Sequence, residues 1–274
     1  MKADLHLHSI YSDAADTIEQ LCRLSVERNL THISIVDHDM TMHIPESIEM
    51  AKKYNLQFIP GIEISAFDFK RNRPVHIFGY GIEAKSEHIL GLCNPLQERR
   101  HAHGMWQAKK IIEAGYSLHL EEALSYAKTS GILFKQHIMR AITEAHPDTA
   151  EYKQLYKELF GNGGLVSEDI EYVDAFEAVK AIKADGGLVV VAHPGQLDSY
   201  ELIEELVALG LDGIDLIHPD HDEMDYAKVR ALAEKYNLFM TGGSDYHGVY
   251  SHAMDLETYC INEVPQQLLE KVVK

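Results

Sequence analysis

Short apolar segments alternate with amphipathic segments along most of the 274-residue chain. The apolar segments are rich in β-branched and aliphatic residues, which is typical of strands, and the segments between them repeat apolar residues with the helical period. This alternation predicts an α/β fold with a largely parallel sheet. The predicted strands are residues 3–6, 32–36, 57–63, 75–80, 187–193, 213–217 and 239–242.

The amphipathic segments predict the connecting helices, and the strand number predicts a barrel-like sheet. From about residue 96 to residue 170 the alternation stops, and the chain becomes rich in helix formers and charge, as in QERRHAHGMWQAKKIIEAG. We therefore expect a barrel domain made of residues 1–95 and 171–274, with residues 96–170 as a helical insertion that covers the active site. The predicted helices of the barrel are residues 17–28, 44–54, 175–185, 200–209 and 226–236.

Composition limits the partners of this chain. Its formal net charge of -18 disfavours binding to long nucleic acid, whereas a small phosphorylated substrate can still be drawn to a local cationic pocket. No segment approaches the roughly 20 apolar residues of a membrane span, and the first residues lack the apolar run of a signal peptide. We expect a cytoplasmic protein without membrane contact. Three widely spaced cysteines indicate neither a disulfide framework nor a cysteine-rich zinc site.

The 17 histidines are the unusual feature of the composition, because neutral imidazole is the commonest metal ligand. His6 and His8 lie two residues apart in an extended segment, so both rings point to the same side. Asp245 and His247 repeat this spacing after the last predicted strand. Most of the other candidates fall at strand ends, where parallel barrels assemble active sites. The candidate metal ligands are His6, His8, Asp13, His38, Glu63, His76, His193, Asp245 and His247.

This set is too large for one ion, since a catalytic zinc takes three protein ligands plus water. A single histidine at a strand end is more often a hydrogen-bonding residue than a ligand, but independent coincidence at so many strand ends is improbable. We expect two or three divalent ions, with Glu63 as the best bridging carboxylate. Nitrogen and oxygen ligands without sulfur suit Mn, Fe or Zn and do not choose among them. Such ions activate water and stabilise charge during displacement at phosphorus.

The motifs DLHLHSIYSD, IVDHD, GIEIS, VHIFGYGI, AHPG and GSDYHG resemble, in order and over the whole chain, those of the PHP (polymerase and histidinol phosphatase) phosphoesterases. The resemblance implies a distorted (β/α)7 barrel with a trinuclear metal centre at the strand ends. A hydroxide bridging the first two ions would attack phosphorus. The implied ligand sets are His6, His8, Glu63 and Asp245 for one ion, Glu63, His76 and His193 for a second, and Asp13, His38 and His247 for a third.

Within this family the chain resembles a bacterial group with a helical insertion, related to 3',5'-bisphosphonucleotide phosphatases and enzymes that trim short RNA. Those relatives carry a Gly-Arg-Pro-His-Ile-Ala-Arg-like segment in the insertion, where this chain has FKQHIMR. Lys135 and Gln136 thus replace Arg-Pro, and lysine lacks the bidentate fork of arginine. The candidate substrate contacts are Arg99, Arg100, Lys135, His137, Arg140 and His221.

The expected reaction is hydrolysis of a phosphate monoester of a small molecule, with a nucleotide or short oligonucleotide as the first choice. Asp245, His193 and His218 are the candidate catalytic residues, with Asp245 or a nearby histidine as proton shuttle. Histidinol phosphate phosphatase and cyclic-phosphate phosphodiesterase are alternatives that use the same ions. Amide hydrolysis is disfavoured because the context of a carboxylated lysine is missing. An accessory module without activity is disfavoured by the complete ligand set.

Overall fold

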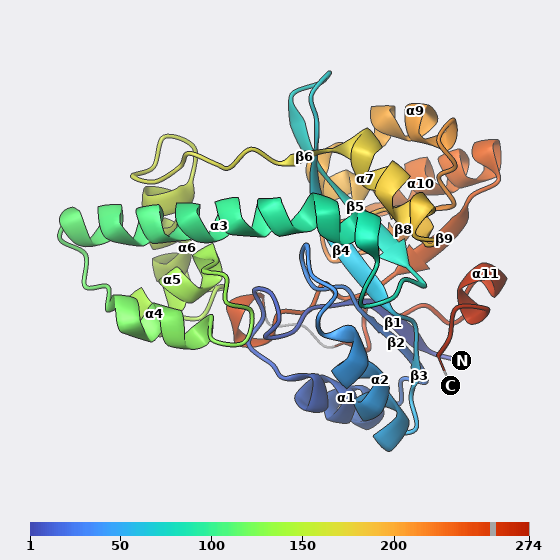
Figure 1. Ribbon diagram of the computed structural model, residues 1–274, viewed down its shortest axis with the longest axis horizontal. Coiled ribbons are helices and arrows are strands. Elements are labelled where there is room, and N and C mark those ends of the chain that lie inside the picture. Colours follow the sequence, from blue (N-terminus) through green and yellow to red (C-terminus); the bar gives the residue numbers. More distant parts are fainter. Residues whose placement is uncertain (253–255, 274) are drawn as a thin grey trace.

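The computed structural model describes residues 1–252 and 256–273. Figure 1 shows the strands gathered in one body, with helices packed on its outside, and a group of helices that extends to one side of it. The two chain ends lie close together at the opposite side (Figure 1). The molecule therefore consists of a strand-containing body and a helical extension, in agreement with the alternation seen along the chain.

The described strands form two sheets. The first is parallel and has the order β1-β2-β3, and the second has the order β6-β4-β5-β7-β8-β9. The strands of the first sheet are β1 (Ala3–Leu7), β2 (His32–Ile35) and β3 (Gln57–Phe58). Those of the second are β4 (Gly61–Asp68), β5 (Arg73–Tyr80), β6 (Val173–Asp174), β7 (Leu188–Val191), β8 (Gly213–Ile217) and β9 (Phe239–Gly242).

Backbone hydrogen bonds join the two sheets at two places. Beyond β1, the amide of His8 donates to the carbonyl of Tyr246, which follows β9, at 3.1 Å. Beyond β2, the amide of Glu63 donates to Val36 at 3.0 Å, and the amide of Asp39 donates to Glu63 at 2.9 Å. The curved sheets thus bring residues from both of them around one centre, and the predicted α/β fold is confirmed.

Two details of the predicted sheet are wrong. Strand β5 runs antiparallel to both β4 and β7, because a tight turn after Asp68 folds β4 back onto β5 as a hairpin. The predicted strand 57–63 is two strands in different sheets, with Pro60 between them. Proline has no N–H for a strand ladder, which favours an interruption at this position. Consequently Glu63 lies near the beginning of β4 and not at the end of a strand.

The helices of the body agree closely with the predicted ones. Helix α1 begins at a capping box formed by Thr17 and Gln20, and α7 begins where the Asp174 carboxylate accepts two backbone amides. The segment 200–209 differs, since it is a 3-10 turn (Tyr200–Leu202) followed by α9 (Ile203–Val207). Besides α9, the helices of the body are α1 (Ile18–Glu27), α2 (Ile44–Lys53), α7 (Ala175–Ala184), α8 (Pro194–Leu197), α10 (Glu223–Tyr236) and α11 (Gln266–Leu269).

The helical extension is attached to the body through one long helix, α3 (Glu87–Glu113). Near its start, Cys93 and Leu96 pack in the core beneath the second sheet, whereas Ala108 and Ile111 near its end pack in a separate core of the extension. Helix α3 therefore crosses the predicted boundary at residue 95, and the division into domains stays a prediction. The other helices of the extension are α4 (Leu120–Tyr126), α5 (Lys135–Ile142) and α6 (Ala150–Phe160).

None of the helices in the described part of the chain is long and apolar enough to cross a membrane. The cytoplasmic location stays a prediction.

Substitutions at the two glycines of α3 test the close contact between this helix and the backbone of the extension at Leu133. A Cβ on Gly104 would overlap the carbonyl of Leu133, so Gly104→Ala should lower the free energy of unfolding by about 1–3 kcal/mol. Nothing lies within 4 Å of a Cβ on Gly91, so Gly91→Ala is the matched control and should raise it by up to about 1 kcal/mol. Chemical denaturation measures both. Equal effects of the two substitutions would contradict the close contact at Gly104.

Candidate metal centre

The loop after β1 is held in place by Asp37, a buried residue that follows β2. Its carboxylate accepts hydrogen bonds from the Ser9 amide at 2.8 Å, the Ser9 hydroxyl at 2.6 Å and the Ser12 hydroxyl at 2.6 Å. These three hydrogen bonds hold the loop backbone that carries His8 and Asp13. Asp37 is thus a residue that positions the candidate ligands.

Four side chains converge at the centre of the two sheets. The Nε2 atoms of His6 and His8 lie 3.1 Å apart. They lie 3.2 and 3.1 Å from Oε2 of Glu63 and 3.0 and 3.3 Å from Oδ1 of Asp245. Imidazole nitrogens and carboxylate oxygens converging in this way offer lone pairs to one point, which is the arrangement that a divalent cation stabilises. The donor set therefore fits a metal ion.

Glu63 also faces a second group with its other oxygen. Its Oε1 atom lies 2.8 Å from Nδ1 of His76 and 2.8 Å from Nε2 of His193. His76 reaches this point from the middle of β5, because the antiparallel hairpin places it opposite Ser65 of β4. The Glu63 carboxylate thus stands between two sets of histidines, as a carboxylate that bridges two ions must.

A third group lies on the other side of His8. Oδ1 of Asp13 is 3.2 Å from Nε2 of His247, and Oδ2 of Asp13 is 4.0 Å from Nε2 of His38. The rings of His8 and His247 stack with their centroids 4.2 Å apart. Three groups of residues can each offer ligand atoms that lie within 4.8 Å of one another inside the group. They are His6, His8, Glu63 and Asp245; His8, Asp13, His38 and His247; and His38, Glu63 and His76.

All nine predicted ligands therefore gather in one place, and six of them are buried. The sets overlap with the implied sets without matching them in full. His8 also joins Asp13, His38 and His247, and His38 stands with Glu63 and His76 in place of His193. The assignment of particular residues to particular ions stays a prediction, as does the number of ions.

Two of the candidate ligands have an unusual backbone conformation. His193 and Asp245 have φ angles of 23° and 52°, in the left-handed region that residues other than glycine rarely adopt. Such strain costs about 1–3 kcal/mol per residue and is typical of functional sites. This left-handed backbone conformation accompanies side chains that point toward the centre.

The buried charges of the centre shift the protonation of its histidines. Burial lowers the pKa of His38 and of His193 to about 3, which leaves both rings neutral and able to bind a metal ion. Burial would also lower the pKa of His8, but Asp245 and Glu63 raise it to about 10. The same carboxylates raise the pKa of His6 well above its usual value. The metal-free centre therefore holds protons where a cation would lie.

A cavity of about 200 Å³ opens beside His38 and His76, and it contains two of the predicted substrate contacts. Arg100 donates to Oδ2 of the buried Asp39 at 2.7 Å, and its guanidinium packs 5.2 Å from the ring of Phe134. Lys135 lines the same cavity, 3.8 Å from Oδ2 of Asp169. Both cations are thus already paired with carboxylates.

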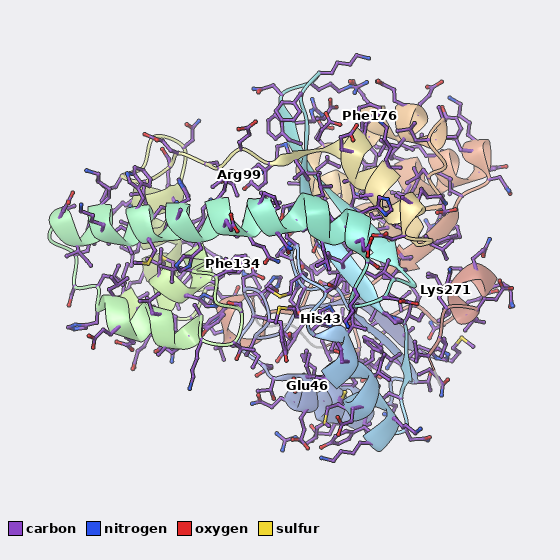
Figure 2. All side chains as sticks on the ribbon, viewed as in Figure 1. His43, Glu46, Arg99, Phe134, Phe176 and Lys271 are labelled. Atoms are coloured by element: carbon purple, nitrogen blue, oxygen red, sulfur yellow. The ribbon has the colours of Figure 1, made fainter. Side chains whose placement is uncertain are left out.

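The other predicted substrate contacts do not line the cavities beside the centre. Arg99 donates to the carbonyl of Glu171 from the middle of α3 (Figure 2). Nδ1 of His137 accepts the amide of Phe134. His221 accepts the amide of Gly195. Arg140 lies on α5 away from both cavities. Their roles as substrate contacts stay predictions.

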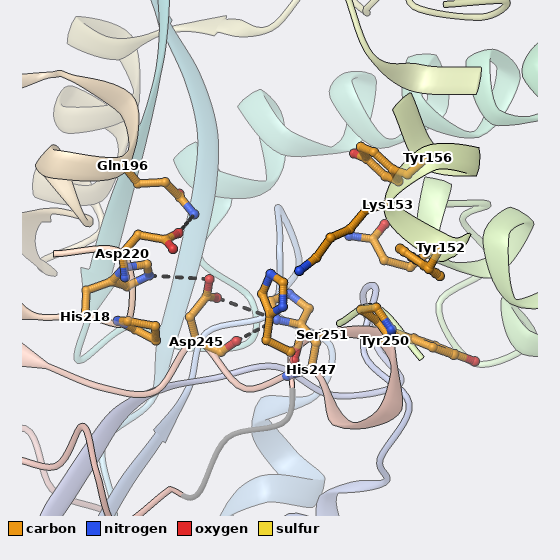
Figure 3. A pocket seen from close by; sticks show the side chains of 14 residues that line it. Tyr152, Lys153, Tyr156, Gln196, His218, Asp220, Asp245, His247, Tyr250 and Ser251 are labelled. Carbon is orange, nitrogen blue, oxygen red and sulfur yellow. Dashed lines mark hydrogen bonds and ion pairs between the residues drawn. The ribbon is translucent and has the colours of Figure 1, made fainter. Parts of the chain in front are cut away.

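A second, larger cavity of about 460 Å³ lies beside Asp245 and His247 (Figure 3). His218, a predicted catalytic residue, lines it with Nε2 at 3.4 Å from Oδ2 of Asp245. The remaining lining includes residues from α5, α6, α8 and the segments after β8 and β9 that the sequence did not indicate as substrate contacts: Gln136, Tyr152, Lys153, Tyr156, Gln196, Asp220 and Tyr250.

Gln136 is the most informative of these unpredicted residues. Its Nε2 donates to Oδ2 of Asp13 at 2.8 Å, and its side chain lines both cavities. It occupies the position at which the resembling proteins have proline, which has no side-chain donor. The change of Arg-Pro to Lys135-Gln136 therefore alters the surroundings of a candidate ligand, which the sequence alone did not indicate.

Comparison with known proteins gives a family and several relatives. The family model described as "PHP domain" matches residues 4–237. A phosphoribosyl 1,2-cyclic phosphate 1,2-diphosphodiesterase of Eggerthella lenta is 45% identical over 250 residues, which are 91% of this chain and 95% of that protein. A 3',5'-nucleoside bisphosphate phosphatase of Chromobacterium violaceum is 26% identical, covering 94% and 93%. A 5'-3' exoribonuclease of Salmonella typhimurium is 28% identical, covering 89% and 84%.

Two solved structures share the fold over nearly the whole chain. A Bifidobacterium adolescentis protein assigned as a metal-dependent phosphoesterase superposes with a TM-score of 0.86 at 22% identity, covering 98% of this chain and 94% of that one. A Chromobacterium violaceum protein described as an amidohydrolase superposes with a TM-score of 0.85 at 22% identity, covering 99% and 97%. At this identity the likeness concerns the fold alone.

Metal binding should release protons. His6 and His8 have raised pKa values and are protonated at neutral pH in the metal-free protein, whereas a metal ion binds only the neutral ring. Metal affinity should therefore rise as the pH rises toward the pKa of these histidines. Titration calorimetry in buffers with different ionisation enthalpies measures the protons released. Identical heats in all buffers would contradict this prediction.

Glu63→Gln should lower the metal content of the protein. The amide keeps the shape of the side chain but removes the negative charge that faces five histidines. Elemental analysis after dialysis measures the ions bound per chain. Glu87→Gln, an exposed substitution in the first turn of α3, is the control and should bind as much metal as the unchanged protein. Full metal content in Glu63→Gln would show that the carboxylate does not bridge ions.

Proposed function

The chain belongs to the PHP domain family, and from this premise we propose that it is a metal-dependent phosphodiesterase that opens the cyclic phosphate of a phosphorylated ribose. The observation that carries the chemistry is the Glu63 carboxylate, which stands between two sets of histidines at 2.8–3.2 Å. The prediction of a hydrolase that acts on phosphoric ester bonds agrees with the family and with the names of the relatives.

The choice of substrate rests on the relatives. The Eggerthella lenta protein, named for a phosphoribosyl 1,2-cyclic phosphate, shares 45% of its residues with this chain over nearly its full length. The bisphosphate phosphatase and the exoribonuclease share 26% and 28%. The replacement of Arg-Pro by Lys135-Gln136 also separates this chain from the latter group. We therefore rank the cyclic phosphodiester, an alternative at the level of the sequence, above the nucleotide monoester.

We propose two or three divalent ions, Mn, Fe or Zn, held by the nine ligands described above. When bound, such ions lower the pKa of a water molecule and neutralise charge on a phosphoryl group. Hydrolysis of the cyclic diester adds one water, forms one P–O bond and breaks another. It leaves a phosphate monoester and a free sugar hydroxyl, so a proton must reach the departing oxygen.

His218 is suited to deliver that proton. Its Nδ1 accepts the backbone amide of Asp220 at 3.1 Å, so the neutral ring carries its proton on Nε2. This Nε2 faces Oδ2 of Asp245 at 3.4 Å on the wall of the larger cavity. The Asp245 carboxylate orients the ring, and the protonated form of His218 can pass its Nε2 proton to the leaving oxygen. His193 is held against Glu63, which favours its role as a ligand over one in proton transfer.

A phosphatase acting on a nucleotide monoester is the second candidate. The Chromobacterium violaceum relative has that name, and a cavity of about 460 Å³ accommodates a nucleotide as well as a sugar phosphate. Since some relatives are named exoribonucleases, the exclusion of long nucleic acid stays a prediction.

The metal-loaded protein should hydrolyse phosphoribosyl 1,2-cyclic phosphate, and a chelator should abolish the activity. His8→Ala removes a ligand shared by two groups, so kcat/KM should fall by at least about 100-fold. Phosphorus NMR follows the opening of the ring. His88→Ala, an exposed histidine of α3, is the control and should keep its activity. Faster hydrolysis of adenosine 3',5'-bisphosphate than of the cyclic phosphate would favour the second candidate, and turnover of neither would refute both.

A further inference from the structure

We infer that Lys153 and the larger cavity form a subsite for a second phosphate group of the substrate, one that does not react. This inference rests on the proposed function and deepens it, because it assigns a place to the part of the substrate away from the metal centre. Lys153 lies on α6, in the helical extension, and no motif marks it.

The cavity has the position and size for a phosphorylated sugar. Asp245, His247 and His218 line it on the side of the metal centre, so a phosphoryl group held there lies at one end of the space. Its volume of about 460 Å³ falls within the range of small-molecule sites. A substrate whose reacting phosphate is at the centre must therefore extend toward the helical extension.

Lys153 is the only lysine or arginine among the described residues that line this cavity. Figure 3 shows its side chain extending from α6 toward the region of Asp245 and His247. No carboxylate among the described residues lies within ion-pair distance of its ammonium group. Arg100 and Lys135, by contrast, face Asp39 and Asp169 across the smaller cavity. Lys153 is thus the cation beside the centre whose charge is still available to an anion.

The other wall of the cavity determines where the anionic group can lie. There Gln196 donates to Oδ2 of Asp220 at 2.6 Å, which places a carboxylate opposite Lys153 (Figure 3). A phosphate is repelled from that carboxylate, whereas sugar hydroxyls can donate to it. Tyr152, Tyr156 and Tyr250 line the same cavity as Lys153. The substrate is therefore oriented with its hydroxyls toward Asp220 and its second phosphate toward Lys153.

The test compares Lys153→Ala with Lys157→Ala, which removes the same charge one turn further along α6 at a position outside the cavity lining. Each protein is assayed with phosphoribosyl 1,2-cyclic phosphate and with ribose 1,2-cyclic phosphate, which lacks the second phosphate. Lys153→Ala should raise KM for the phosphorylated substrate by about 10- to 100-fold and change kcat less. KM for the unphosphorylated substrate should not change, and Lys157→Ala should behave like the unchanged protein.

Binding of ribose 5-phosphate, measured by calorimetry on the metal-loaded proteins, separates the subsite from the catalytic proposal. Binding that weakens in Lys153→Ala and is partly restored in Lys153→Arg supports the subsite, even if no cyclic phosphate is hydrolysed and the proposed function fails. If both cyclic phosphates are hydrolysed and Lys153→Ala affects neither KM nor ribose 5-phosphate binding, the subsite is refuted and the proposed function stands. Equal losses in Lys153→Ala and Lys157→Ala would also refute it, since they would reflect general surface charge.

Discussion

The carboxylate of Glu63 is the element on which the rest of the structure depends. One oxygen faces His6 and His8, the other faces His76 and His193, and these residues come from β1, β5 and the segments that follow β1 and β7. A buried anion is costly unless charges of opposite sign compensate it. The raised pKa values of His6 and His8 favour protons that compensate it, and the proposed cations would take their place. The fold therefore places histidines from several strands around one buried carboxylate.

The backbone of the same residue joins the sheets. The amide and carbonyl of Glu63 bond to Val36 and Asp39, so the first sheet meets the second beside the Glu63 side chain. Asp39 in turn pairs with Arg100 of α3, and Asp13 accepts a hydrogen bond from Gln136 of α5. The helical extension is thus tied to the centre at two carboxylates. Movement of the extension would change both the cavities and the surroundings of the ligands.

Under the proposed function, the candidate metal ligands and the proposed substrate contacts lie mostly in different parts of the molecule. The ligands and His218 belong to the strand-containing body, which is held together by backbone ladders and a buried core. Lys135, Gln136 and Lys153 belong to the extension, which has its own smaller core. Substrate preference can therefore change through the extension while the metal centre stays the same. The range of substrates named for the relatives, from cyclic phosphates to RNA ends, is consistent with that separation.

The sequence by itself determined the α/β class and the nine candidate ligands, because their signals are local. Residues two apart in a strand share a face, and the apolar runs before His38 and His193 predict strands from the local pattern alone. Only the tertiary structure decided that β5 runs antiparallel, that Glu63 lies at the beginning of β4, and that Gln136 and Lys153 approach the centre. The approach of Gln136 and Lys153 depends on packing between segments that are distant in the sequence, as with Gln136 and Asp13, which are 123 residues apart. No local pattern of hydrophobic and polar residues encodes such contacts.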